Sequence, residues 1–64
     1  MNTEEKIYKF VKKNGKVPRT QISHMLNIPY YRCKYILEEL VKKGKLKRIK
    51  TLRGTYYEVK EAIE

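Results

Sequence analysis

Pro29 to Lys43, PYYRCKYILEELVKK, decides the fold because its residues separate onto two chemically different faces of a helix. At about 100° per residue, one broad apolar arc contains Cys33, Ile36, Leu37, Leu40 and Val41. The opposite arc contains Tyr31, Lys34, Tyr35 and Glu38, with Arg32 on its flank. Such a helix packs against a core through its apolar arc and presents tyrosines and cations to a negatively charged partner.

The whole chain is basic, and its charge is concentrated in the second half. Its 64 residues include 16 Lys and Arg against 7 Asp and Glu, which gives a formal net charge of +9. Nine basic residues and two acidic ones lie between Arg32 and Arg53. This distribution predicts a polyanionic partner, whereas a generally lysine-rich, solvated surface is the alternative.

Size and composition exclude several classes of protein. A chain this short has room for one small core, so we expect residues 1–64 to form a single domain. One Cys, one His and no CxxC motif provide neither a disulfide within the chain nor a metal site, and we expect no cofactor. The single histidine has no catalytic partner near it in sequence, so we do not expect an enzyme. The first ten residues lack an apolar signal core, and we expect a soluble cytoplasmic protein.

The residues before the decisive stretch predict two further helices. The first spans about 3–14, with Asn2 or Thr3 as its cap and Asn14-Gly15 at its end. Its apolar stripe consists of Ile7, Phe10 and Val11. Val17-Pro18 should be extended and add a small edge strand, because a proline keeps the preceding residue out of the helical region.

A second, short helix over about 20–26 should begin with Thr20 as its cap. Its apolar positions are Ile22, Met25 and Leu26. Asn27 stands where the following turn needs a positive φ, and the third helix then spans about 29–43. On its surface, Glu38 and Glu39 precede Lys42 and Lys43 by four residues, which predicts two i,i+4 ion pairs.

The remaining residues predict a β-hairpin with strands at about 45–51 and 55–59. A register that sets Lys50 opposite Thr55 leaves a four-residue loop from Thr51 to Gly54. It also pairs Lys47 with Glu58 and sends Leu46, Tyr57 and Val59 toward the core. The expected fold class is therefore α+β and mainly α, with three helices followed by a hairpin.

Two sets of residues are candidates for contact with a nucleic acid. Side chains from the first turns of a helix can reach base edges in the major groove, so Tyr31, Lys34 and Tyr35 are expected to contact bases. The candidates for contact with the backbone are Thr20, Gln21, Tyr30, Arg32, Lys47, Lys50 and Arg53. The alternative for the tyrosines is that they cover a thin core or form a dimer face.

The run TEEKIYKFVKKNGKVPRTQISHMLNIPYYRCKYILEELVKKGKLKRI resembles the winged helix-turn-helix family of small prokaryotic and archaeal transcription regulators. The resemblance covers roughly residues 3–59 and implies a three-helix core, a β-hairpin wing and sequence-specific binding of double-stranded DNA, frequently as a homodimer. Asn27 stands in place of the usual glycine of the turn. The expected role is that of a repressor or an architectural factor at the nucleoid, without a cofactor.

Two other interpretations stay open. Winged helices also act as protein–protein interaction modules, and an apolar patch formed by Tyr8, Tyr30, Tyr31 and Ile63 would indicate that role. An RNA-binding winged helix is the other alternative, and single strands would then compete well with duplex DNA.

Overall fold

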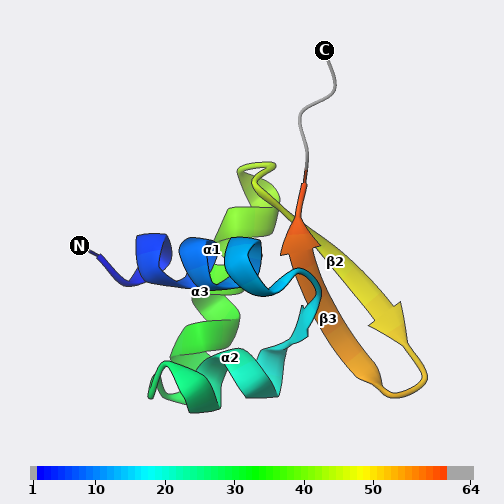
Figure 1. Ribbon diagram of the computed structural model, residues 1–64, viewed down its shortest axis with the longest axis horizontal. Helices are drawn as coiled ribbons and strands as arrows, with labels where there is room; N and C mark the ends of the chain where they lie inside the picture. The colour runs from blue at the N-terminus through cyan, green and yellow to red at the C-terminus, as the bar shows by residue number, and fades with distance from the viewer. Residues whose placement is uncertain (1, 61–64) are drawn as a thin grey trace.

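Three helices are followed by an antiparallel hairpin in the computed structural model, which describes residues 2–60 (Figure 1). The elements in chain order are α1 (Thr3–Asn14), β1 (Val17–Pro18), α2 (Arg19–Met25), α3 (Tyr30–Lys42), β2 (Leu46–Thr51) and β3 (Gly54–Val59). The hairpin projects away from the three helices as a wing (Figure 1). The α+β, mainly helical architecture expected from the sequence is thus confirmed. Within the described residues, no helix is both long enough and apolar enough to cross a membrane.

The sheet has the strand order β1-β3-β2, and both pairings are antiparallel. Val17 lies opposite Tyr57, which confirms the small edge strand expected before α2. In the hairpin, Lys50 lies opposite Thr55 and Lys47 opposite Glu58, as the predicted register required. The predicted four-residue loop is wrong, however, because Thr51 also pairs with Gly54. Only Leu52 and Arg53 therefore form the tip of the wing.

The core takes at least one buried side chain from every helix and strand. These side chains are Ile7, Val11, Val17, Ile22, Cys33, Leu37, Leu40, Leu46 and Tyr57. Removing a buried leucine or isoleucine from such a core costs about 2–5 kcal/mol. Because three of the nine belong to α3, the core fixes both the position of this helix and the face that it turns outward.

The predicted apolar stripe of α2 is wrong at one position. Ile22 is buried and Leu26 is partly buried against the core, but the side chain of Met25 is 60% exposed. On a helix, Leu26 lies about 40° from Ile22, whereas Met25 lies about 60° away on the other side. The core covers only the Leu26 side of this short helix.

Helix α1 begins as the sequence predicted and α2 does not. The Asn2 Oδ1 accepts a hydrogen bond of 2.7 Å from the backbone N–H of Glu5, which confirms the first cap. Helix α2 begins at Arg19, and no side chain caps it. The predicted cap at Thr20 is wrong because β1 continues to Pro18, so that Thr20 already lies in the first helical turn.

The turn between α2 and α3 is held by hydrogen bonds in both directions. The Ser23 hydroxyl donates to the Ile28 carbonyl at 2.6 Å, and the Ile28 N–H donates to the Ser23 carbonyl at 3.0 Å. Asn27 has a φ of 55°, which confirms the expected left-handed residue. Pro29 then occupies the position just before α3, which ends at Lys42. This turn sets the direction in which the first turn of α3 leaves the core.

Candidate nucleic-acid interface

The polar face of α3 stands open to solvent. The side chain of Tyr31 is 78% exposed and that of Tyr35 is 66% exposed, and Lys34 between them is exposed as well. Arg32 is exposed on the flank. The alternative in which these tyrosines cover a thin core is therefore wrong. The structure brings the three predicted base-contacting side chains together on one outward face.

Tyr30 lies at the start of α3 but turns toward α2. Its hydroxyl accepts a hydrogen bond of 3.1 Å from Nη1 of Arg19, and the guanidinium carbon lies 5.9 Å from the centre of its ring. The ring is still about half exposed. Tyr30 therefore belongs with the first turn of α2 and not with Tyr31 and Tyr35.

Three of the predicted backbone contacts line one groove of about 250 Å³ between the helices and the wing. Its walls are Pro18, Arg19, Thr20, Tyr30, Arg53, Gly54 and Thr55. Thr20 comes from the first turn of α2, Tyr30 from the start of α3 and Arg53 from the tip of the wing. Gln21 is exposed beside Thr20 but does not line the groove. The starts of two helices and the wing tip thus meet at one place.

Side chains along β2 point alternately to the two faces of the hairpin, which places the two lysines predicted to contact the DNA backbone on opposite faces. Leu46 is buried and Arg48 reaches α3, so Lys50, two residues further on, lies on the same face of the hairpin. Lys47 belongs to the opposite face, where its cross-strand partner is Glu58. The structure therefore brings Lys50 to the α3 side together with the tip and leaves Lys47 on the other side.

A cluster of polar side chains joins α2, α3 and both strands of the wing. The Glu38 carboxylate accepts two hydrogen bonds from Nη1 of Arg48, at 2.6 and 2.8 Å, and one of 3.2 Å from the Tyr57 hydroxyl. Nη2 of Arg19 donates to the Tyr57 hydroxyl at 2.7 Å and lies 3.6 Å from the same carboxylate. This Glu38 cluster ties α3 to the wing.

The ionisation of the Glu38 cluster follows from its contacts. Partial burial by itself would raise the pKa of Glu38, but the hydrogen bonds from Arg48 and Tyr57 and the nearby guanidinium charges lower it overall. Burial raises the pKa of the Tyr57 hydroxyl. Burial works against the charge of Arg19, yet the tyrosine hydroxyls hold the pKa of its guanidinium above the usual value. At neutral pH the cluster therefore holds one carboxylate between two guanidinium groups.

The sequence analysis missed Arg19 and Arg48 and misplaced the partner of Glu38. The predicted pair of Glu38 with Lys42 is wrong because Arg48 takes the carboxylate. One signal was available, since the predicted register sets Arg48 opposite Tyr57 on the side that faces α3. A cation on that face needs an acidic partner, and Glu38 lies on the polar arc of the helix that it faces.

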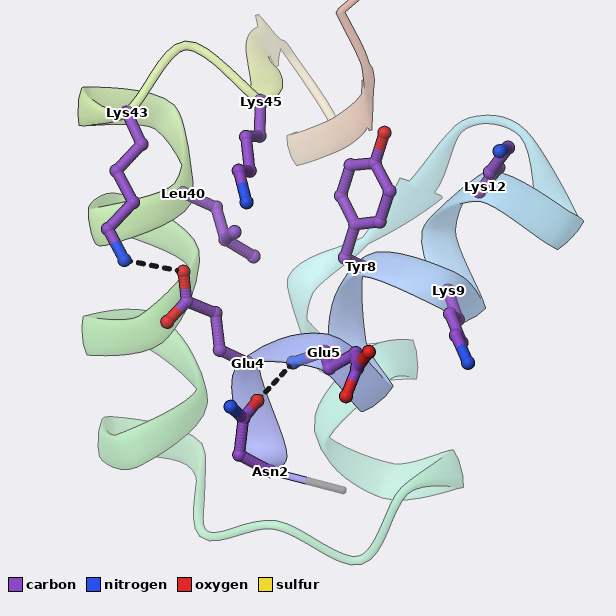
Figure 2. Close-up of a pocket in the computed structure, with 9 residues that line it drawn as sticks. All are labelled: Asn2, Glu4, Glu5, Tyr8, Lys9, Lys12, Leu40, Lys43 and Lys45. Carbon is purple, nitrogen blue, oxygen red and sulfur yellow. Dashed lines mark hydrogen bonds and ion pairs between the residues drawn. The ribbon is translucent and has the colours of Figure 1, made fainter.

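The other predicted surface pair of α3 is also wrong. Nζ of Lys43 lies 2.8 Å from the Glu4 carboxylate of α1 and forms its ion pair there. Figure 2 marks this contact with a dashed line. Glu39 instead lies 4.0 Å from Lys42, at a spacing of three residues. The end of α3 passes close to the start of α1, so a partner from another helix replaces the local one.

A second cavity, of about 540 Å³, lies between α1 and the end of α3. Figure 2 shows Tyr8 of α1 on one side of it, with Lys45 and Leu40 on the facing side. None of the predicted DNA contacts lines this cavity. Tyr8 and Tyr30 therefore lie at different hollows and do not form one apolar patch, and Ile63 is outside the described residues.

A comparison with protein families places the chain in a known family. A family model described as winged helix-turn-helix DNA-binding matches residues 2–47, which include all three helices and the start of the wing. No curated protein and no solved structure matches the chain. The matched residues contain the predicted base contacts on α3 and the Thr20 and Tyr30 walls of the groove.

Proposed function

Because the chain belongs to the winged helix-turn-helix DNA-binding family, we propose that it binds double-stranded DNA through α3, the groove and the wing. The observation that supports this proposal most directly is the exposed Tyr31, Lys34 and Tyr35 face of α3 beside a basic hairpin. Among residues 2–60, the four exposed cations on this side make no ion pair; they are Arg32, Lys34, Lys50 and Arg53.

In this proposal α3 enters the major groove and contacts base edges. Lys34 donates to the O6 or N7 of a guanine, while the tyrosine rings contact thymine methyl groups and their hydroxyls bond to bases or phosphates. The apolar arc of the helix is packed against the core, which keeps these side chains on a rigid support. Sequence preference comes from this face alone.

The groove and the wing hold the DNA backbone. A strand that crosses the groove meets the Thr20 hydroxyl, the Tyr30 hydroxyl and the Arg53 guanidinium within one hollow. Such contacts fix the register of the protein on the duplex but carry no sequence information. Lys50 adds a cation on the same side of the hairpin. The protein acts as a transcriptional repressor or architectural factor by occupying its site.

Selection of bound duplexes from a random pool, followed by anisotropy titrations on the best one, tests the proposal. Neutralising about four phosphates predicts a slope of log K against log salt of roughly −3.6, which is about a 150-fold loss of affinity from 50 to 200 mM salt. Lys34→Ala should cost about 1–3 kcal/mol on that duplex and relax preference at one position.

Lys9→Ala is the matched control, because Lys9 is an exposed lysine on α1 at the other cavity. It removes the same charge and should change affinity little. An equal loss from Lys9→Ala and Lys34→Ala would show that the chain binds by its overall charge, without a defined face. Single-stranded RNA that competes as well as the duplex would favour RNA as the ligand.

A further inference from the structure

The tip of the wing carries a fully exposed leucine. Leu52 has an exposure of 108%, the highest of the exposed large apolar side chains among the described residues. It occupies the first position of the two-residue loop between Thr51 and Gly54, where its φ is not positive and the turn does not require a particular residue type. A side chain this exposed contributes nothing to the packing of the hairpin, so the fold does not explain it.

The backbone of the tip is held in place by Thr51. Its hydroxyl donates to the Gly54 carbonyl at 3.0 Å and accepts from the N–H of Arg53 at 3.1 Å. Gly54, with a φ of 144°, allows the chain to return directly into β3. Leu52 is therefore presented on a defined turn and not on a long loop.

The surroundings of the tip are strongly cationic. Lys50 and Arg53 flank Leu52, and no acidic residue occurs in the sequence between Glu39 and Glu58. Arg53 lines the same groove as Tyr30, the first residue of α3. Figure 1 shows the tip of the wing and α2 at the same end of the molecule. When α3 occupies a major groove, the tip is thus directed toward the neighbouring stretch of the duplex.

We propose that Leu52 is a wedge that enters the minor groove, partly unstacks one base step and bends the DNA. The proposal rests on the DNA binding proposed above. A leucine between base pairs gains apolar contact that offsets the loss of stacking, and the resulting bend brings more phosphate toward the wing. The chain is then a DNA-bending protein as well as a DNA-binding one.

Energy transfer between dyes at the two ends of a short duplex tests the bend. The probe is a mixed-sequence duplex of about two helical turns that contains one TA step and is used at low salt, where binding does not need a selected site. The wild-type protein should raise the transfer on binding, and Leu52→Ala should reduce that rise by at least half. Affinity should fall by about tenfold or less, because the lost apolar contact is offset by the bending that is no longer needed.

Met25→Ala is the matched control, since it also shortens an exposed apolar side chain of similar size, on α2. It should leave the bend unchanged. Both side chains are exposed, so both variants are expected to keep the helical circular-dichroism spectrum of the wild type. A 2-aminopurine placed at the TA step should brighten when wild-type protein binds and much less with Leu52→Ala.

The outcomes distinguish the two proposals. A wild-type protein that binds the duplex without raising the transfer, or a Leu52→Ala variant that bends it fully, would overturn the wedge and leave DNA binding intact. If the wild-type protein does not bind duplex DNA at low salt, the proposed function fails and the wedge fails with it. A bend that disappears equally in Met25→Ala would also contradict a role specific to the wing tip.

Discussion

Replacing Glu38 by Gln should destabilise the protein by about 1–2 kcal/mol. The carboxylate accepts two short hydrogen bonds from Arg48 and one from Tyr57. The side-chain amide of Gln has only one, uncharged, acceptor oxygen. Its NH2 group would face the N–H and O–H groups of Arg48 and Tyr57, which are donors themselves. Hydrogen bonds to charged groups contribute about 1.5–3 kcal/mol, and this figure must be reduced here because the Glu38 side chain is 33% exposed and partly screened by solvent. For a domain of this size the expected fall in Tm is about 7–15 °C.

Glu39→Gln is a closely matched control for this prediction. Glu39 is the next residue of the same helix, its side chain is 35% exposed, and its ion pair is a long contact of 4.0 Å with Lys42. The substitution changes the net charge by the same amount but should cost less than about 0.5 kcal/mol. Thermal unfolding followed by circular dichroism compares the two variants. Equal shifts in Tm would refute a specific contribution from the Glu38 cluster.

The pH dependence of stability gives a second test of the Glu38 cluster. The pKa of Glu38 is lower in the folded protein than in the unfolded chain, so folding is favoured by the ionised carboxylate. This contribution is fully present above the unfolded pKa of about 4.3 and is lost as pH falls through the lower folded value. The difference in unfolding free energy between wild type and Glu38→Gln should therefore stay constant from pH 8 to about pH 5 and then narrow. A difference that does not narrow at all as the pH falls below about 4 would contradict the assignment.

Three further predictions concern the wing, the turn and the core. Arg53→Ala should weaken binding to all duplexes alike and reduce the slope of log K against log salt by about one, as measured by anisotropy in a salt series. A loss of affinity confined to one DNA sequence would contradict a contact with the backbone. Asn27→Ala should cost about 1–2 kcal/mol in urea unfolding, because φ is 55° at this position, whereas Asn27→Gly should cost much less. Burial raises the pKa of the Cys33 thiol, so Ellman's reagent should label it rapidly only in urea; rapid labelling of the native protein would contradict its burial.

Local periodicity was sufficient to predict α3 with its two faces and the register of the wing. The two faces of α3 follow from a spacing of about 3.6 residues, and Cys33 and Leu37 are buried as that spacing requires. The register of the hairpin followed from pairing chemistry on both faces, and it was confirmed at Lys50 and Thr55. Asn27 was recognisable because few residue types tolerate a positive φ.

Features that depend on contacts between distant residues could not be predicted in this way. The prediction that Thr20 caps α2 was wrong because β1 pairs with β3 up to Pro18, and this pairing joins segments far apart in the chain. The predicted partner of Glu38 was wrong for the same reason. Helix spacing favours Lys42, whereas the folded chain brings Arg48 to the Glu38 carboxylate. The groove likewise depends on distant residues, because its walls come from the starts of α2 and α3 and from the wing tip.

The Glu38 cluster also determines which charges face the proposed partner. An unpaired carboxylate on the polar face of α3 would repel phosphate, and Arg48 and Arg19 neutralise it within the protein. The same contacts hold the hairpin against the helix before any DNA is present, so less conformational entropy is lost when both elements bind. Loosening the cluster should therefore weaken binding even where every cation on the surface is kept. Glu38, although acidic, is therefore expected to increase the proposed affinity for DNA.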